Sequence, residues 1–339
     1  MTTKIIIKRI LSYLFSYSGI HSLLEYFCLS NKAFLLMYHR VIASADNQPC
    51  FVQPGMFVTT ASFERQIAFL KDRFEIVFIE DLVEKTLLGE EIGKHCAITF
   101  DDGWRDNFTD AFPILKKYRV RATIFLATGF VGTDKMFWPE EICYCLDRSM
   151  ATKSALGSAP PSYIHFNKEI SRYSRCKREM FFDRSIEILK GYSSGDRDEI
   201  LGHYRATFKV NPLPRQMLNW DEAREMLASG LVRFGAHTVN HEILDQVSLL
   251  KAQAEICKSR KEIEHCLGGK VSIFAYPNGN HNESIRGILA ENGFNLAVTT
   301  RKGLFDHSTP LLEIPRVAMH EDVSSTIPMS RSRILFPKF

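Results

Sequence analysis

One segment decides the fold class and points to the chemistry: Ala97-Ile98-Thr99-Phe100-Asp101-Asp102-Gly103. Its apolar part is typical of a buried strand, and it stops abruptly at the glycine. Adjacent carboxylates repel each other and lose solvation when partly buried, so a fold rarely places them at a strand end for stability alone. A metal ion removes that conflict, because one carboxylate ligates it while the other stays ionised beside it as a general base. Asp-Asp-Gly also forms ordinary polar turns, so the interpretation needs a second motif.

That second motif lies far downstream, in His237-Thr238-Val239-Asn240-His241. Two imidazoles four residues apart fall on one face of a helix, at a spacing that suits a divalent metal. The sequence therefore predicts that Asp102, His237 and His241 bind a metal and leave a position open for water or substrate. Zinc is expected from nitrogen and oxygen ligation, although cobalt, nickel or iron would suit the same side chains. With Asp101 as the base, the predicted reaction is metal-assisted hydrolysis of an amide or ester.

Apolar strands alternate with amphipathic helices from Ala33 onward, which predicts an α/β fold with a parallel sheet and crossover helices. Seven or eight strands indicate closure into a barrel. Asn219 and Glu222 form a capping box at the start of one expected helix. The expected strands lie near residues 34–38, 75–79, 97–100, 122–127, 232–236, 272–276, 295–299 and 314–318, and the expected helices include 62–71, 110–118, 221–229, 249–267 and 283–292.

Residues from about 139 to 219 interrupt this alternation. They lack strand patterns and are rich in Lys, Arg, Ser and Tyr, so we expect a helical insertion within a barrel domain that covers residues 33–324. The insertion is either a substrate lid over one mouth of the barrel or a peripheral addition. Residues 325–339 are expected to form a C-terminal tail.

Residues 1–32 are expected to form an amphipathic helical segment, in which Gly19 separates two stretches with helical apolar spacing. Serines and tyrosines interrupt the apolar character, so the pattern is typical neither of an export signal nor of a membrane span. The segment either packs on the main domain as a helical hairpin or lies on the inner leaflet of the cytoplasmic membrane as a basic anchor. We accordingly expect a cytoplasmic protein, peripheral to the membrane under the second alternative.

Polar side chains follow the predicted strands at their carboxyl ends. His39, Asp101-Asp102, His237, Pro277-Asn278-Gly279 and His320 all lie at or just beyond such ends. In a parallel barrel these ends form one face, where active sites are built. We therefore expect these distant segments to meet in space.

Composition and charge exclude other classes of protein. The 339 residues are 45% hydrophobic and 24% charged, as in an ordinary globular protein. A net charge of +4 without Lys/Arg runs argues against a nucleic-acid partner. The eight cysteines form no Cys-x-x-Cys pair in a chain too long to need disulfides, so buried reduced thiols are expected.

Three motifs together resemble those of the polysaccharide deacetylases, carbohydrate esterase family 4, which share the chitooligosaccharide-deacetylase (NodB) homology domain. They are Thr99–Gly103, His237–His241 and Phe274–Gly279. Further similarities lie at residues 36–41, 104–107 and 314–317, so the likeness covers roughly residues 33–324.

The resemblance implies a distorted (β/α) barrel of about seven or eight parallel strands with a helical insertion, and the removal of acetyl groups from N-acetylated sugars. It assigns the base to Asp101 and the metal to the same three ligands as above. Many relatives carry an arginine in the third motif where this chain has Ala275. Arg316, on the last strand, either replaces that arginine beside Asp101 or forms an ordinary ion pair.

The resemblance also implies a histidine near the C-terminus that protonates the leaving amine. His320 is the candidate at the right strand end; otherwise it is a solvated loop histidine. The backbone near Asn278, together with Tyr276, is expected to hold the substrate or its oxyanion. Trp104 either stacks on a sugar ring or packs in the core, and His39 either contacts substrate or satisfies core hydrogen bonds.

The expected function is that of a metal-dependent de-N-acetylase acting on a polysaccharide, a glycolipid or its precursor, in cell-envelope or exopolysaccharide biosynthesis. Two alternatives stay open: amide hydrolysis on a non-sugar small molecule, and a catalytically silent carbohydrate-binding protein. The presence of Asp101 argues against the silent protein, since a binder needs no base beside a metal.

Overall fold

The computed structural model describes residues 3–45, 48, 51–151, 159–209 and 213–336, and these fall into two compact units. Unit 1 comprises the chain up to residue 43 with residues 54–133 and 217–339. Unit 2 comprises residues 44–53 and 134–216. It therefore corresponds to the expected insertion, but begins somewhat earlier and includes a second short segment that the sequence did not indicate.

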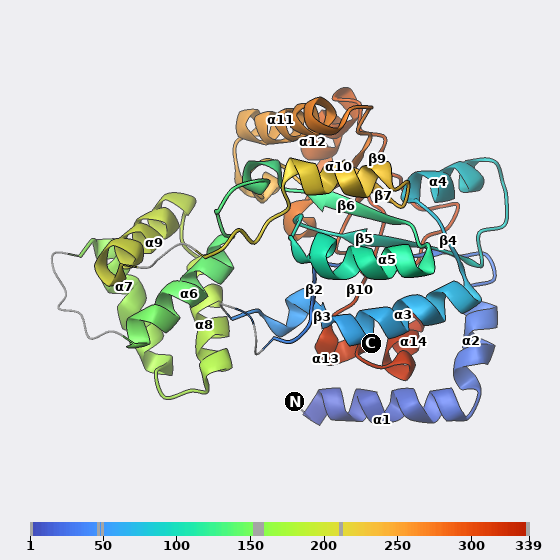
Figure 1. Cartoon of the computed structure of the whole chain (residues 1–339), viewed down its shortest axis with the longest axis horizontal. Helices are drawn as coiled ribbons and strands as arrows, with labels where there is room; N and C mark the ends of the chain where they lie inside the picture. Colours follow the sequence, from blue (N-terminus) through green and yellow to red (C-terminus); the bar gives the residue numbers. More distant parts are fainter. Residues whose placement is uncertain (1–2, 46–47, 49–50, 152–158, 210–212, 337–339) are drawn as a thin grey trace. The chain divides into compact units, whose positions relative to one another are not determined.

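A parallel sheet forms the centre of unit 1 (Figure 1). Its strands are ordered β10-β1-β5-β6-β7-β8-β9, and β4 pairs with β5 outside this path. The strands are β1 (Phe34–Tyr38), β4 (Glu75–Ile76), β5 (His95–Phe100), β6 (Ala122–Leu126), β7 (Val232–Ala236), β8 (Ile273–Ala275), β9 (Leu296–Val298) and β10 (Val317–Ala318).

The segment 314–318 joins the two edges of this sheet. Val317 pairs with Leu36 of β1, and Ile314 forms an isolated parallel bridge with Val298 of β9. The amide of Thr299 also donates to the Ile314 carbonyl at 2.9 Å. The sheet thus closes through one short segment, and the predicted distorted (β/α) barrel is confirmed.

Strand side chains alternate between two apolar cores, which is why the strands are apolar throughout. Leu36 and Ile98 lie in the core that the sheet shares with the helices packed on it. Leu35, Ala97 and Phe125 point to the opposite face, into a second core inside the barrel. Because both faces of each strand are buried in apolar cores, the strands are held in place. The polar residues that follow them are therefore held at the carboxyl ends of the strands.

Helices connect successive strands and cover the sheet (Figure 1). The expected capping box at Asn219 and Glu222 is present. One expectation is wrong: the strand predicted near residues 75–79 ends at Ile76, and a helix begins at Ile79. The helices are α3 (Thr60–Arg73), α4 (Ile79–Leu87), α5 (Phe112–Tyr118), α10 (Trp220–Ala228), α11 (Leu249–Leu267) and α12 (Glu283–Glu291), and a small parallel sheet pairs β2 (Arg40–Ile42) with β3 (Phe57–Thr59).

Helices from both ends of the chain pack together on unit 1. The N-terminal helices α1 (Thr3–Tyr17) and α2 (Ile20–Cys28) contact the C-terminal helix α14 (Ile327–Leu335) (Figure 1). The expected tail beyond residue 324 is therefore wrong for its described part, since residues 329–335 are all buried. Serines and arginines dominate this stretch, so no apolar period marks it as a core helix. Among the described residues, no helix combines the length and apolar character needed to cross a membrane.

The described part of unit 2 is helical, as predicted, and has its own apolar core. Cys143 and Cys145 are buried in this core as free thiols. The prediction that unit 2 acts as a substrate lid stays a prediction. The helices are α6 (Trp138–Ala151), α7 (Pro161–Ile170), α8 (Arg178–Lys190) and α9 (Ser194–Phe208).

His21 makes the packing of α2 on α14 sensitive to pH. Its buried imidazole places Nε2 2.9 Å from Oγ of Ser332. Burial and the charge of Arg331 lower the pKa of His21 from 6.5 to about 4, while Glu25 opposes the shift. The unfolded segment takes up a proton below about pH 6.5, whereas the folded segment does so only near pH 4. Stability that is complete above pH 6.5 is therefore lost as the pH falls through this window.

We expect this packing to weaken by about 1–2 kcal/mol between pH 7 and pH 5. Hydrogen exchange of the α2 backbone amides, corrected for the intrinsic exchange rate, measures the change. A His21→Gln variant keeps a neutral hydrogen-bonding side chain and should lose the pH dependence. The same dependence in both proteins would contradict the assignment to His21.

Candidate metal centre

The predicted site residues follow strands that end on the same face of the barrel. His39 follows β1, Asp101 follows β5, His237 follows β7, and His320 lies just beyond β10. The segment 276–279 follows β8. Since all pairings in this sheet are parallel, their carboxyl ends share one edge, as the sequence predicted.

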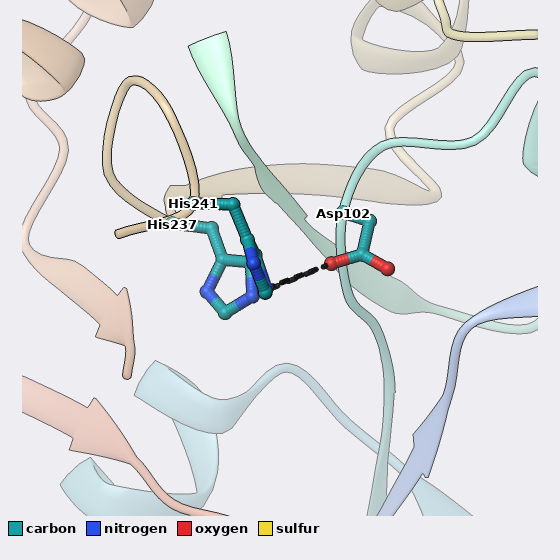
Figure 2. Close-up of side chains that lie close together, drawn as sticks. All are labelled: Asp102, His237 and His241. Atoms are coloured by element: carbon teal, nitrogen blue, oxygen red, sulfur yellow. Dashed lines mark ion pairs between the residues drawn. The ribbon is translucent and has the colours of Figure 1, made fainter. Parts of the chain in front are cut away.

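Asp102, His237 and His241 form a cluster in which both imidazoles face the carboxylate (Figure 2). One ligand atom from each residue lies within 4.8 Å of the others. Nε2 of each histidine lies 3.5 Å from the same oxygen, Oδ1 of Asp102. Atoms bound about 2.1 Å from a common tetrahedral ion lie roughly 3.4 Å apart, so these distances fit a small divalent metal.

The segment between the two histidines is a loop, and the prediction that they share a helix face is wrong. Thr238 and His241 have φ values of 63° and 56°. These are left-handed conformations, which an α-helix does not contain. The two left-handed turns, rather than a helical period, direct both rings toward Asp102.

Glu255 of α11 holds this loop in place. Its buried carboxylate accepts hydrogen bonds from the backbone amides of Val239 and Asn240, each at 2.8 Å, and from the Asn240 side chain at 2.7 Å. On another side, the Gly129 amide donates to the Val239 carbonyl at 2.8 Å. Sequence reasoning missed Glu255, because one glutamate among several on an amphipathic helix carries no signal of the loop that it contacts.

Hydrogen bonds outside the cluster orient two of the candidate ligands. Nδ1 of His237 lies 2.7 Å from the Ala275 carbonyl. A carbonyl only accepts, so Nδ1 carries the proton and the neutral ring presents the Nε2 lone pair to the cluster. The indole N–H of Trp104 donates to Oδ2 of Asp102 at 2.9 Å, while Oδ1 faces the histidines. Such outer contacts fix the orientation of metal ligands.

The surroundings shift the pKa values of all three candidate ligands, and the shifts of His241 and Asp102 favour their ligating forms. Burial lowers the pKa of His241 to about 4, although Asp102 opposes the shift, so this ring is neutral at neutral pH. Burial also lowers the pKa of His237, but its hydrogen bond with Asp102 and the charge of Asp101 outweigh that effect and raise it. Burial raises the pKa of Asp102, yet its contacts with the neighbouring imidazoles, above all His237, bring it far below its usual value.

Asp101 is paired with Arg316, and both side chains are buried. Nη1 and Nη2 of the guanidinium donate to the two carboxylate oxygens at 2.7 Å each. Arg316 also donates to the Thr99 hydroxyl and the Thr299 carbonyl, each at 3.0 Å. Burial by itself raises the pKa of Asp101, but Arg316 outweighs it and holds this pKa below its usual value. Arg316 therefore contacts Asp101 as expected if it replaces the arginine missing from the third motif.

Of the two alternatives for Trp104, the structure shows packing in the core. It is only 1% exposed, and its N–H is committed to Asp102. The guanidinium of Arg40 lies 4.4 Å from its ring centroid. Arg40 in turn donates to Asp106 at 2.8 Å, and Asp106 accepts from the Val41 amide at 2.9 Å. Arg40 and Asp106 lie in the motifs quoted above, but no role was assigned to them from sequence.

Two residues of the third motif, Tyr276 and Asn278, differ in whether their side chains are accessible to a substrate. Tyr276 is buried and its hydroxyl donates to the Leu312 carbonyl at 3.0 Å, so the expected substrate contact is wrong for this side chain. Asn278 is exposed, with a φ of 57°, and its side chain donates to Asn280 at 2.8 Å. The amide of Gly279 donates back to the Tyr276 carbonyl at 2.8 Å. The role of Asn278 stays a prediction.

His39 and His320 lie at strand ends, and their roles also stay predictions. His39 is half-buried, and its charge lowers the pKa of both Asp101 and Asp102. His320 precedes the short helix α13 (Glu321–Ser324), and its Nδ1 contacts Oδ1 of Asp322. This contact orients the imidazole and directs Nε2 away from Asp322.

The model of the polysaccharide deacetylase family matches residues 89–155 and 198–297 of this chain. The matched parts contain Asp101 and all three candidate metal ligands. The match lies mainly in the barrel of unit 1 and reaches into both ends of the insertion.

Individual proteins agree with this family. YxkH of Bacillus subtilis, named as a polysaccharide deacetylase, is 20% identical over 294 residues, which are 86% of this chain and 73% of YxkH. A poly-β-1,6-N-acetyl-D-glucosamine N-deacetylase of Staphylococcus aureus is 31% identical over 112 residues, which are 31% of this chain and 39% of that enzyme. The structure of the Streptococcus pyogenes deacetylase PplD with acetate has the same fold, with a TM-score of 0.56 and 20% identity over 87% of this chain and 96% of PplD.

A Glu255→Ala substitution should destabilise unit 1 by about 3 kcal/mol, because it leaves the amides of Val239 and Asn240 without their charged acceptor. The midpoint of thermal unfolding should fall accordingly. Glu262→Ala is the matched control, since Glu262 lies on the same helix and its nearest ion pair, with Lys258, is a surface contact of 3.7 Å. Equal midpoints for the two variants would show that Glu255 does not stabilise the loop.

Proposed function

We propose, from the premise that the chain belongs to the polysaccharide deacetylase family, that this protein removes the acetyl group from an N-acetylated sugar by hydrolysis. One observation carries the proposal: two adjacent buried carboxylates have different partners. Asp102 faces two imidazoles, and Asp101 faces a guanidinium. This division suits a metal ligand beside a general base, the pair that amide hydrolysis requires.

Asp102, His237 and His241 are the proposed ligands of a divalent metal, with zinc expected and cobalt, nickel or iron as alternatives. When bound, such an ion supplies Lewis acidity to a water and to the acetyl carbonyl oxygen. The distances and the neutral state of His241 support this assignment. One carboxylate with two imidazoles is also a donor set typical of catalytic zinc sites.

Asp101 is the proposed general base. Arg316 keeps its carboxylate ionised and fixes the direction of both oxygens. As the water oxygen forms its bond to the acetyl carbon, the proton of the water passes to Asp101. The role of Arg316 is to position that base, and it does not contact substrate itself.

His320 is the proposed general acid, and its contact with Asp322 orients the ring. Nε2 donates a proton to the sugar nitrogen as the carbon–nitrogen bond breaks, so the products are acetate and a free amino sugar. The backbone around Asn278 is proposed to stabilise the charge on the acetyl oxygen. His39 is proposed to contact the substrate from the end of β1.

The proposed substrate is an N-acetylated sugar of a polysaccharide, a glycolipid or its precursor, in exopolysaccharide or cell-envelope biosynthesis. The relative from S. aureus is named for such a polymer, and the structure of PplD contains acetate, the product of this reaction. We place the reaction in the cytoplasm, on a lipid-linked or nucleotide-linked sugar.

Measurements of metal content and of acetate release distinguish the residues that bind the metal from the residue that acts as the base. His237→Ala and His241→Ala should lose both the metal and turnover. Asp101→Asn should keep about one ion per chain, yet release acetate at least roughly 100-fold more slowly, because the base is gone. Mass spectrometry of the purified proteins and acetate release from N-acetylglucosamine oligomers measure the two quantities.

His307→Ala is the control, since His307 bonds the Thr86 carbonyl at 3.1 Å and follows none of the site strands. It should keep metal and activity. Loss of metal in Asp101→Asn would show that Asp101 is the ligand and that the proposed roles of the two carboxylates must be reversed. A protein that binds metal but releases no acetate from any sugar would favour a different amide substrate.

A Trp104→Phe substitution tests the orientation of Asp102. Phenylalanine keeps an aromatic ring beside Arg40 but removes the N–H that bonds Oδ2, so metal affinity should fall about 10–100-fold. Competition with a chelator measures the affinity, and the thermal midpoint checks that the core stays packed. An unchanged affinity would show that this hydrogen bond does not orient the ligand.

A further inference from the structure

The N-terminal helices expose an unusual amount of apolar surface. Sixteen large apolar side chains are exposed in the described residues, and nine of them lie on α1 and α2. The other seven are scattered over the rest of the chain. The nine, exposed by 38–86%, are Ile6, Ile7, Ile10, Leu14, Tyr17, Ile20, Leu23, Tyr26 and Phe27; together they form what we call the N-terminal apolar face.

Helical spacing places these side chains away from the body of unit 1. Ile6, Ile10 and Leu14 recur every four residues along α1, so they form one stripe. Ser12 of α1 and His21 of α2 are buried instead, on the side that contacts α14. Figure 1 shows α1 at the outside of this packing. The apolar stripe is therefore not explained by contacts within unit 1.

Polar contacts fix α2 on unit 1, so its part of the N-terminal apolar face stays exposed to solvent. Arg331 of α14 donates to Glu25 at 2.6 Å and to the Ser22 hydroxyl at 3.1 Å. Arg73 of α3 donates to the same glutamate at 3.1 Å. Glu25 thus ties α2 to both α3 and α14, and the exposed side chains need no unfolding to reach a partner.

The positive charge of α1 indicates which kind of partner suits the N-terminal apolar face. No Asp or Glu occurs before Glu25, whereas Lys4, Lys8 and Arg9 lie in α1. Arg9 is exposed beside Ile10. A cationic helix with aliphatic and aromatic side chains on its open side suits the interface of an anionic bilayer. A second copy would instead bring two cationic segments together, which disfavours self-association.

We propose that the N-terminal apolar face binds the surface of an anionic phospholipid bilayer, with α1 and α2 lying in the plane of the interface. A helix of 15 residues spans only about 22 Å, so α1 is too short to cross the hydrocarbon core and lies along it. The proposal does not depend on the proposed hydrolysis, because it rests on the exposed side chains and charges of α1 and α2 alone.

Co-sedimentation of the full chain with vesicles tests it. The wild-type protein should sediment with vesicles of phosphatidylcholine and phosphatidylglycerol, and less with phosphatidylcholine alone or at high salt. The double variant Ile10→Asp/Leu14→Asp should bind at least about tenfold more weakly, because two inserted side chains are lost. Leu23→Asp provides an independent test on α2.

The matched control is Leu249→Asp/Leu250→Asp, which changes two neighbouring leucines that are 52% and 81% exposed at the start of α11. It should bind vesicles like the wild type, and thermal midpoints should be equal for all folded variants. Wild-type protein that stays in the supernatant, or equal binding by the α1 variant, would overturn the proposal. A wild-type dimer that the α1 variant abolishes, without vesicle binding, would assign the face to a second copy.

Discussion

Two neighbouring carboxylates lie almost completely buried at the end of β5, and the site is organised by the cost of burying them. Asp101 is 2% exposed and Asp102 is 4% exposed. Two such charges at one strand end are unstable unless each has its own compensation. Asp101 receives both hydrogen bonds of a guanidinium fork, while Asp102 receives an indole N–H and faces two imidazoles. The different partners give the two residues different chemistry.

The guanidinium of Arg316, which compensates the charge of Asp101, also contributes to the closure of the barrel. Arg316 lies in the segment 314–318 that joins the two edges of the sheet, and it also bonds Thr99 on β5 and Thr299 just after β9. Removing one partner of a buried ion pair typically costs about 3–5 kcal/mol, because the other charge is left uncompensated. The short β9 and β10 contribute few ladder hydrogen bonds, so this side chain also helps to hold the last segment in place.

Unfavourable backbone conformations are concentrated in the site. Six described residues other than glycine have positive φ, and four of them are Asp102, Thr238, His241 and Asn278. Each such residue costs on the order of 1 kcal/mol, and it persists only when its surroundings hold it. Glu255 supplies that support for the histidine loop, and Trp104 bonds the side chain of Asp102. The supporting residues thus account for the orientation of the candidate ligands.

The sequence alone determined the alternation of strands and helices, the barrel, and which polar residues stand at the strand ends. The strands are continuous apolar stretches and the helices have a helical period of apolar residues, so β7 and α11 have the predicted bounds. Only the tertiary structure decided how those residues are oriented: the loop conformation of residues 237–241, the burial of Trp104 and Tyr276, and the pair between Arg316 and Asp101, which are 215 residues apart. Hydrogen bonds between such distant partners leave no local period, because the fold creates them when it brings the strand ends together.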